Sequence, residues 1–491
     1  MKKYLIVIDQ GTTSSRVVLI DSKTKIIDQD FIEIKRKDNN NSEVLTDANE
    51  ILFSVNDLLK RLFQRNNLDP KLVSSISITN QRETTVLWSA KTGKPISDAI
   101  SWQSKHTNYI TDKWIELGYT ELVFDKTGLL INPYFSASKI KHLLINNNSD
   151  INNIKFGTVD SFLIYNLSVE KNHYTDISNA SRTMLFNINN KEYDDELLEL
   201  FNIPKSILPK VLSNDSLYGH YQYKDTLIPI IGVAGDQQSA LFGHLCTEVG
   251  ESKVTYGTGC FILTNTGDKP KYSNNGLLTT IAWDLDNKTT YAMEGSVFMG
   301  GSAVGWMKDK LNLVNHANES EAMAYESNND NVFVVPAFVG LGAPYWDNEV
   351  QGSILGLEAN TSKLDIMKAT LNSIAYQVAD ILNLMKNDTK IDIKSIAVDG
   401  GASNNNYLMQ FQSDLINVNL IQNVESEITS LGVAFMAGLK LGLWKSIEEI
   451  KNLQKIKKIF VPIVDQSKTN KLYRKWRKAV EVTRMFKEEK Q

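Results

Sequence analysis

Two short turns in this chain carry the residue types that hold phosphate groups. The first turn is Gly11–Ser14 and the second is Gly257–Gly259, and each lies between two apolar runs. Both supply backbone N–H groups and threonine hydroxyls at a tight bend, an arrangement that binds anions. Asp9 ends the apolar run before the first turn, where a carboxylate could hold Mg²⁺ or its waters beside a phosphate. One Gly-Thr turn alone is more often an ordinary β-hairpin, so it is the pair that indicates a polyphosphate site.

Two pairs of polar residues follow strand-like runs elsewhere in the chain. Arg82-Glu83 comes after one such run and Asp236-Gln237 after another. Neighbouring Arg and Glu residues usually form a surface ion pair, but the carboxyl ends of strands in open α/β sheets are where ligands bind. The carboxylates could accept hydrogen bonds while the guanidinium and the amide donate them. This mixture suits a substrate with several hydroxyl groups.

Two aromatic residues could cover the carbon skeleton of such a substrate. Trp102 follows the Arg82-Glu83 pair, and Phe261 follows the second phosphate-binding turn. A single aromatic side chain more often belongs to a hydrophobic core, so these two positions are candidate ligand walls with a structural alternative.

The spacing of the two turns predicts how the chain is organised. Gly11 and Gly257 lie about 246 positions apart, roughly half of the 491 residues, which is the mark of an internal duplication. We therefore expect two like domains, 1–246 and 247–491, with the boundary near Gly243–Glu251. Two like halves that face each other would form a cleft with one turn on each side.

The rest of the chain alternates between strand-like and helix-like runs, which predicts an α/β fold. The clearest strand-like runs are Val73–Thr79, Lys155–Val159, Ile228–Ala234, Asn331–Pro336 and Ser395–Asp399. Apolar residues at three- and four-residue spacing predict helices over Leu364–Met385 and Ile428–Leu443, and a charged C-terminal helix over Leu472–Lys490.

A glycine-rich turn follows the last of these strands. Asp399 is followed by Gly400, Gly401 and Ala402, and a helix is expected to begin near Asn404. Such a turn lets a planar base or a ribose approach the backbone closely, although a plain strand-to-helix connection would have the same sequence.

Composition excludes several classes of protein. A net charge of −4 and an isoelectric point near 6.0 do not favour nucleic acid as a partner. The two cysteines, Cys246 and Cys260, cannot build a disulfide framework and are expected to be buried free thiols in a reducing compartment. No run reaches membrane-spanning length, and Asp9 ends the N-terminal apolar run after about five residues, too early for a signal peptide. A cytoplasmic location is expected.

The motifs together closely resemble the FGGY carbohydrate kinases, which have the actin-like ATPase (ribonuclease H-like) fold. They occur in order along both halves: Asp9–Arg16, Ile78–Thr85, Pro133–Ser136, Asn179–Phe186, Ala234–Gln238, Tyr256–Phe261, Gly340–Trp346 and Asp399–Ala402. The resemblance implies two duplicated domains flanking a cleft. It also implies ATP-dependent phosphorylation of glycerol to sn-glycerol 3-phosphate, the entry step of glycerol catabolism, with Mg²⁺ and by a homodimer or homotetramer.

The resemblance also implies roles for individual residues. The positions that match glycerol contacts are Arg82, Glu83, Tyr134, Asp236 and Gln237, with Trp102 and Phe261 as apolar walls. The positions that match nucleotide contacts are Thr12, Thr13, Ser14, Arg16, Thr258, Gly301, Gly401 and Asn405. Asp236 matches the catalytic base and Asp9 the residue near magnesium. Tyr134, Gly301 and Asn405 are implied by the resemblance alone.

The sequence departs from the family pattern at two places. Gly305 stands where bacterial members usually have Gln, so one side-chain contact near the nucleotide is missing. The stretch from Gly219 to Thr226, interpreted as a loop, lacks the Gly/Arg motif of members inhibited by fructose bisphosphate. It has Gln222 at the position of the histidine phosphorylated in other members, and His220 lies two positions away. Both forms of regulation are expected to be absent.

Two other functions fit parts of the same pattern. A kinase for a pentulose or another polyol would share the fold, although the matches at 80–85 and 133–136 favour glycerol. An actin-like or chaperone-like ATP-driven binding protein would share the hairpins. It would not need the Arg82-Glu83 and Asp236-Gln237 pairs, and it would not phosphorylate a small alcohol.

Overall fold

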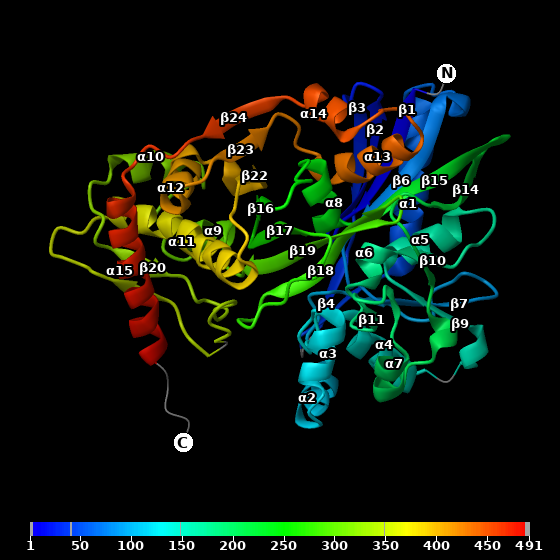
Figure 1. Cartoon of the computed structure of the whole chain (residues 1–491), viewed down its shortest axis with the longest axis horizontal. Helices are drawn as coiled ribbons and strands as arrows, with labels where there is room; N and C mark the ends of the chain where they lie inside the picture. Colours follow the sequence, from blue (N-terminus) through cyan, green and yellow to red (C-terminus); the bar gives the residue numbers. More distant parts are fainter. Residues whose placement is uncertain (1–2, 40–41, 148, 348, 487–491) are drawn as a thin grey trace.

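The computed structural model describes residues 3–39, 42–147, 149–347 and 349–486. Its centre is two mixed β-sheets (Figure 1). The first sheet has the strand order β14-β15-β6-β1-β2-β3. Its strands are β1 (Tyr4–Gln10), β2 (Ser14–Asp21), β3 (Ile26–Glu33), β6 (Val73–Asn80), β14 (Leu217–Tyr223) and β15 (Thr226–Gly235).

The second sheet has the strand order β18-β19-β17-β16-β22-β23-β24. Its strands are β16 (Glu251–Tyr256), β17 (Cys260–Gly267), β18 (Leu278–Leu285), β19 (Lys288–Val297), β22 (Ser395–Asp399), β23 (Leu420–Asn423) and β24 (Ile456–Phe460). In the first sheet β1 pairs antiparallel with β2 and parallel with β6. In the second sheet β16 pairs in the same way with β17 and β22. This repeated pairing confirms the duplication and both predicted hairpins.

Two helices lie between the sheets and form a shared core. They are α8 (Asp236–Gly243) and α13 (Ile428–Lys440), which pack on each other. Their apolar side chains join residues of both sheets, such as Val7 and Ala397, in one buried cluster. A Cβ added at Gly432 would collide with the carbonyl of Ser239, so the helices cross closely only because glycine stands there. The close crossing fixes Asp236, at the start of α8, relative to both sheets.

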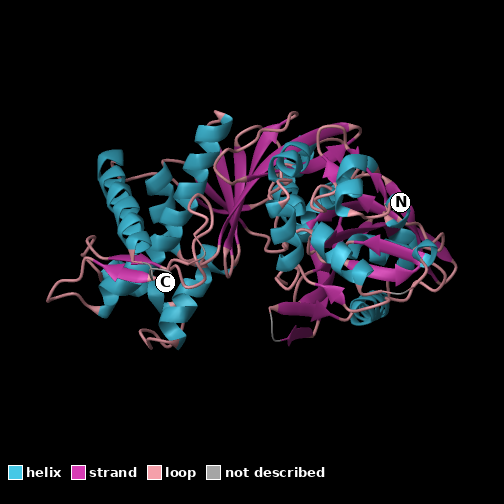
Figure 2. Ribbon diagram, turned by 90° about the horizontal axis from the view of Figure 1, so that it is seen from below, coloured by secondary structure: helices cyan, strands magenta, loops and turns pink. Residues whose placement is uncertain are grey.

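Most of the remaining helices lie in two groups, one towards each end of the molecule (Figure 2). Those of the N-terminal half are α1 (Ala48–Arg65), α2 (Asn108–Glu116), α3 (Thr120–Thr127), α4 (Ser136–Ile145), α5 (Val159–Leu167), α6 (Ile177–Ala180) and α7 (Asp195–Phe201). Those of the C-terminal half are α9 (Gly301–Asp309), α10 (Glu319–Glu326), α11 (Lys363–Thr389), α12 (Asn406–Ile416), α14 (Ile447–Leu453) and α15 (Gln466–Met485). None of the helices described is long and apolar enough to cross a membrane.

Shorter elements connect these layers. The minor strands are β4 (Arg36–Asn39), β5 (Glu43–Thr46), β7 (Val86–Ser89), β8 (Ala99–Ile100), β9 (Ile154–Gly157), β10 (Tyr174–Asp176), β11 (Phe186–Asn187), β12 (Glu192–Tyr193), β13 (Lys210–Leu212), β20 (Phe333–Val335) and β21 (Ser353–Leu355). The 3₁₀ turns are Pro70–Leu72, Ile151–Asn153, Lys205–Ile207 and Gly401–Asn404.

Most predicted elements are confirmed, and the differences have local causes. The strand predicted over Lys155–Val159 ends at Gly157, because Thr158 is the extended N-cap of α5. The helix predicted to reach Leu443 ends at Lys440, two residues before Gly442 with φ +69°. The stretch interpreted as a loop, 219–226, lies mostly in the β14–β15 hairpin. The predicted C-terminal helix is confirmed up to Met485, and residues 487–490 lie outside the described part.

Both cysteines are buried and free, as expected. Burial raises the pKa of the Cys260 thiol to about 12 and also raises that of Cys246. Both side chains therefore act as small apolar groups of the core at neutral pH.

Candidate active site

The two predicted polar pairs meet at the carboxyl ends of neighbouring parallel strands. β15 pairs with β6 so that Gly235 lies opposite Asn80. Arg82 follows β6 and Asp236 begins α8 directly after β15, so both side chains emerge at the same edge of the sheet. The Nε atom of Arg82 lies 3.4 Å from Oδ1 of Asp236. The structure therefore brings Arg82 and Asp236, one residue from each predicted pair, together at this edge of the sheet.

A buried network of ion pairs holds this edge to the second sheet. Nη1 and Nη2 of Arg82 donate to Oε2 and Oε1 of Glu294 on β19, at 2.6 and 2.9 Å. Arg182 donates from Nε to Oε1 of Glu83 at 2.7 Å and from Nη2 to Oε1 of Glu294 at 3.0 Å. All four side chains are at most 3 % exposed. Although burial opposes ionisation, the two guanidinium groups hold the pKa of Glu294 at about 2.

Sequence reasoning assigned no role to Arg182 or Glu294. Arg182 lies inside the motif Asn179–Phe186, which contributed to the family resemblance without a role for any single residue. Glu294 does have a local signal in the sequence. It is an acidic residue inside the strand β19, directly after buried Ala292 and Met293. Both Nη atoms of Arg82 are engaged by Glu294, so the guanidinium turns only its Nε towards Asp236.

Asp236 lies at the open side of this network. Its side chain is 30 % exposed, and its Oδ1 accepts a hydrogen bond from the backbone N–H of Gln237 at 2.7 Å. Burial raises the pKa of Asp236, while Arg82 lowers it. The side-chain amide oxygen of Gln237 accepts a hydrogen bond from Nζ of Lys253. The same Nζ atom also donates to Oγ1 of Thr255 at 2.9 Å. A partly exposed carboxylate beside a fixed amide can accept a proton from a bound hydroxyl.

The predicted aromatic residues stand together beside the polar groups. The ring of Trp102 lies 5.5 Å from that of Tyr134 and 6.5 Å from that of Phe261, both edge to face. Trp102 also donates from Nε1 to Oγ1 of Thr12 at 2.9 Å. Trp102 therefore joins the first candidate phosphate-binding turn to the candidate substrate site, and Phe261 approaches from the second sheet.

Both candidate phosphate-binding turns form tight bends. The N–H of Gly11 donates to the carbonyl of Ser14, and that of Gly257 to the carbonyl of Gly259, both at 2.9 Å. The first turn carries Thr12, Thr13 and Ser14. The second turn is anchored to the start of α9, because Gly301 donates from its backbone N–H to the carbonyl of Gly257 at 2.8 Å. Thr258 is exposed at the tip.

Charged groups surround Asp9 at the base of the first hairpin. Burial, together with the like charges of Asp236 and Glu427, raises the pKa of Asp9 to about 7, although Arg16 lowers it. Arg16 forms an ion pair with Glu427, which precedes α13. Ser430 approaches Oδ2 of Asp9 only to 3.5 Å. Within the described ranges, no three or more His, Cys, Asp or Glu residues form a group that could hold a metal. A carboxylate of this kind fits Mg²⁺ shared with phosphate oxygens and water.

The glycine turn after β22 has the expected form. Gly400 has φ +86°, and a Cβ there would lie 2.5 Å from the carbonyl oxygen of Tyr256, so only glycine fits. A Cβ added at Gly401 would meet no atom within 4 Å, which leaves room for a ligand. Asn405 is the N-cap of α12, where Oδ1 accepts from the N–H of Leu408 at 2.9 Å. Its Nδ2 donates to Oγ of Ser320 at 3.2 Å, so both ends of the side chain are already engaged.

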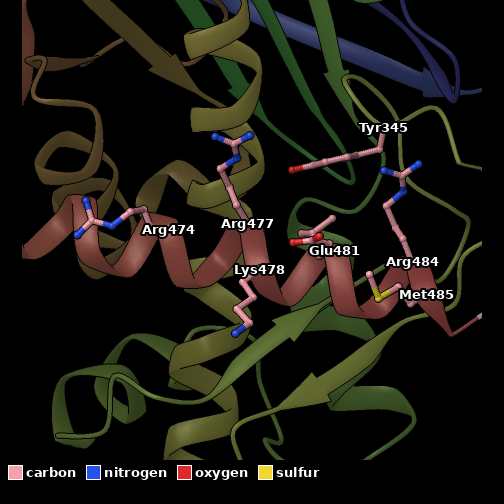
Figure 3. A pocket seen from close by; sticks show the side chains of 8 residues that line it. Tyr345, Arg474, Arg477, Lys478, Glu481, Arg484 and Met485 are labelled. Carbon is pink, nitrogen blue, oxygen red and sulfur yellow. The ribbon is translucent and has the colours of Figure 1, made fainter.

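An open groove of about 720 Å³ along α15 shares no residue with these sites (Figure 3). Its lining includes Arg474, Arg477, Lys478 and Arg484. Figure 3 shows Arg474, Arg477 and Lys478 pointing in different directions, and Arg484 is paired with Asp347 at 3.0 Å. The cations do not converge on one point, so the groove is not assigned to the substrates.

Comparison with known proteins identifies relatives of the whole chain. The family descriptions "FGGY family of carbohydrate kinases", N-terminal and C-terminal domain, match residues 4–243 and 252–441. Glycerol kinase of Ligilactobacillus salivarius is 47 % identical over 99 % of this chain and 98 % of its own length.

Solved structures resemble the whole chain as well. The crystal structure of Plasmodium falciparum glycerol kinase with ADP is 35 % identical, covers 98 % of both chains and has a TM-score of 0.93. Xylulose kinase from Lactobacillus acidophilus, 22 % identical over 98 % of both chains with a TM-score of 0.88, shares the fold. Because the two family descriptions together match most of the chain and the relative from Ligilactobacillus salivarius spans nearly all of it, the chain belongs to the FGGY family of carbohydrate kinases.

Proposed function

We propose that this protein transfers the γ-phosphoryl group of ATP to glycerol and releases sn-glycerol 3-phosphate and ADP. The observation that carries the proposal is the cluster of Arg82, Glu83 and Asp236, held by buried ion pairs beside Trp102 and the first phosphate-binding turn. The relatives from Ligilactobacillus salivarius and Plasmodium falciparum bear the name glycerol kinase. We also propose domains 1–246 and 247–491, a homodimer or homotetramer, and a cytoplasmic location.

Each polar group has a distinct part in the proposed reaction. Glu83 and Gln237 orient the hydroxyl groups of glycerol, together with Arg82 and Tyr134, while Trp102 and Phe261 cover its carbons. Asp236 accepts the proton of the attacking hydroxyl as the new oxygen–phosphorus bond forms. Phosphoryl transfer depends mainly on positioning and on neutralising charge, which suits fixed side chains of this kind.

The phosphates of ATP are proposed to lie between the two hairpins. Thr12, Thr13, Ser14 and Thr258 donate to phosphate oxygens, and Arg16 exchanges Glu427 for a phosphate. Gly301, Gly401 and Asn405 border the nucleotide. Mg²⁺ held near Asp9 would neutralise phosphate charge when bound. Closure of the cleft over both substrates would exclude water, which otherwise competes with glycerol as the acceptor.

A panel assay tests the proposal and its alternatives. ATP consumption is coupled to a spectroscopic readout with glycerol, dihydroxyacetone, xylulose or ribitol as the acceptor. We expect the highest kcat/KM with glycerol. A preference for xylulose would assign the chain to another kinase of the same fold. ATP binding with no phosphorylation of any polyol would favour an ATP-driven binding protein.

We expect Glu83→Gln to raise the KM for glycerol about 10- to 100-fold, because a hydrogen bond to a charged acceptor contributes about 1.5–3 kcal/mol. The KM for ATP should change less than about threefold, since the change lies outside the hairpins. Steady-state kinetics with each substrate varied in turn measure both constants, with Glu170→Gln at the surface as the control. Equal rises in both constants would place Glu83 outside the glycerol site.

The raised pKa of Asp9 predicts a pH-dependent metal requirement. A carboxylate with a pKa of about 7 is protonated at pH 6, and a proton then competes with Mg²⁺, so the apparent affinity should weaken about tenfold per pH unit below 7. In the ligand-free protein the free energy of unfolding should fall as the pH rises from 3.8 to about 7. Over this interval Asp9 ionises in the unfolded chain but stays protonated in the folded protein. Calorimetric titration of ADP with and without Mg²⁺ at pH 6 to 8 measures the metal effect.

The control for this titration is Asp9→Asn. Any pH dependence that remains in Asp9→Asn belongs to the nucleotide itself. A full pH dependence in the variant would show that Asp9 takes no part in holding the metal.

Gly305 offers a test of the missing nucleotide contact. It lies one turn into α9 after Gly301, and a Cβ added there would meet no atom within 4 Å. Gly305→Ala should stabilise the helix by about 0.5–1 kcal/mol without changing the KM for ATP. Gly305→Gln should add a few-fold decrease in that KM, because its amide can reach the nucleotide. Equal KM values for the two variants would argue that position 305 does not face ATP.

A further inference from the structure

A lysine that the proposed reaction does not use is fully buried beside the candidate glycerol site. Lys139 on α4 is 0 % exposed. Its Nζ donates to the backbone carbonyl of Tyr134 at 2.5 Å and to that of Glu83 at 3.3 Å. Among the described residues, it forms no ion pair with a carboxylate within 4.0 Å. Burial lowers the pKa of Lys139 to about 7, although the nearby Glu83 carboxylate opposes this shift.

The two carbonyls belong to residues that are assigned to glycerol. Glu83 has φ +60°, in the left-handed region, which is a strained conformation for a residue with a side chain and persists only where its surroundings hold it. Its carbonyl accepts from three side chains, Oγ1 of Thr85 at 3.1 Å, Oγ of Ser136 at 3.2 Å and Nζ of Lys139. Two of these three donors come from α4, so the helix clamps the backbone of Glu83.

We propose that Lys139 is a positioning residue for substrate binding, because its buried amine ties the backbone of Glu83 to that of Tyr134 and fixes the spacing of the two side chains. The proposal rests on the proposed function. A buried ammonium with no carboxylate partner is costly for a fold. Its long stem starts in the first turn of α4 and reaches two carbonyls that lie 51 positions apart in sequence. A neutral amine still donates hydrogen bonds, so the tie does not depend on the charge.

The test compares Lys139→Met with a matched buried lysine. Lys368 on α11 is 8 % exposed, and its Nζ donates to the carbonyl of Ser327 at 3.0 Å and pairs with Asp330 at 2.7 Å. Lys139→Met should raise the KM for glycerol about 10-fold or more and change the KM for ATP less than twofold. Its thermal midpoint should stay close to that of the wild type, since the cost of burying an amine is removed with it. Lys368→Met should leave both KM values unchanged.

Lys139→Gln provides the conservative comparison, because its amide keeps an N–H donor on a shorter stem and should restore part of the lost glycerol affinity. A glycerol KM that is unchanged in folded Lys139→Met, or a rise shared equally with ATP, would overturn the proposal. If Lys139→Met does not fold, Lys139→Gln takes its place, because its shorter side chain should not keep both hydrogen bonds of the lysine; an unchanged glycerol KM in folded Lys139→Gln then overturns the proposal.

The assay of the wild type separates this result from the proposed function. Should the wild type prefer another polyol, the proposed function fails, and the KM for that polyol is measured in the same variants. A raised KM for that polyol in Lys139→Met then supports the positioning role, and an unchanged KM contradicts it.

Discussion

Replacing Asp236 with Asn is expected to lower kcat about 10²- to 10⁴-fold, the contribution typical of a general base. Asparagine keeps the shape of the side chain but cannot take the proton of the attacking hydroxyl. The affinity for ATP should hardly change, because both hairpins remain intact. Glycerol binding should weaken only moderately, since Arg82, Glu83 and Tyr134 remain. Stopped-flow measurement of a single turnover, with calorimetric titration of each substrate, separates chemistry from binding.

The pH profile adds a second readout for Asp236. Burial raises the pKa of this carboxyl above its ordinary value of 3.8, despite Arg82, so the wild type should lose kcat/KM on the acid side as the base becomes protonated. In Asp236→Asn, the residual kcat/KM should no longer show the decrease at low pH that protonation of Asp236 causes in the wild type. Near-normal turnover in the variant would show that Asp236 only positions the substrate, and another base would have to be sought.

A large loss of stability is expected for Glu294→Gln. This carboxylate receives hydrogen bonds from Arg82 and Arg182 inside the molecule, and removing one member of a buried ion pair costs about 3–5 kcal/mol. The KM for glycerol should also rise at least about 10-fold. Arg82 loses its ion pair with Glu294 directly, and Glu83 becomes less well held because its partner Arg182 loses the same ion pair. Urea unfolding and steady-state kinetics measure the two effects.

The matched control is Glu170→Gln. Glu170 pairs with His220 at 2.6 Å, but both side chains are about one third exposed, so the loss should be at most about 1 kcal/mol. Similar losses in the two variants would mean that the buried network adds no more than a surface pair.

The same network sets how stability depends on pH in acid. The folded-state pKa of Glu294 is about 2, below its ordinary value of 4.5. The stabilisation from its charge is therefore fully present above pH 4.5 and is lost as the pH falls towards 2. The difference in stability between the wild type and Glu294→Gln should narrow over that interval, whereas a constant difference would contradict the assignment.

Features that depend on neighbouring residues could be predicted from the sequence. Both hairpins follow from apolar runs around short Gly/Thr turns. The meeting of Arg82 with Asp236 follows from their places after parallel strands, because the carboxyl ends of such strands share one edge of a sheet. The strand extended to Val159 was wrong because an apolar residue fits a strand end and a first helical turn equally well.

The sequence by itself determined the fold class and the duplication, because these depend on local patterns and on motifs read in order, and it predicted which side chains would lie at the strand ends. Only the tertiary structure decided the partners of those side chains. Arg82 is paired with Glu294, 212 positions away, and Arg16 with Glu427, 411 positions away. Such pairs depend on how the two sheets pack around α8 and α13. Packing also sets burial, and burial moves the pKa values of Asp9, Lys139 and Asp236, since the cost of a charge depends on everything that surrounds it.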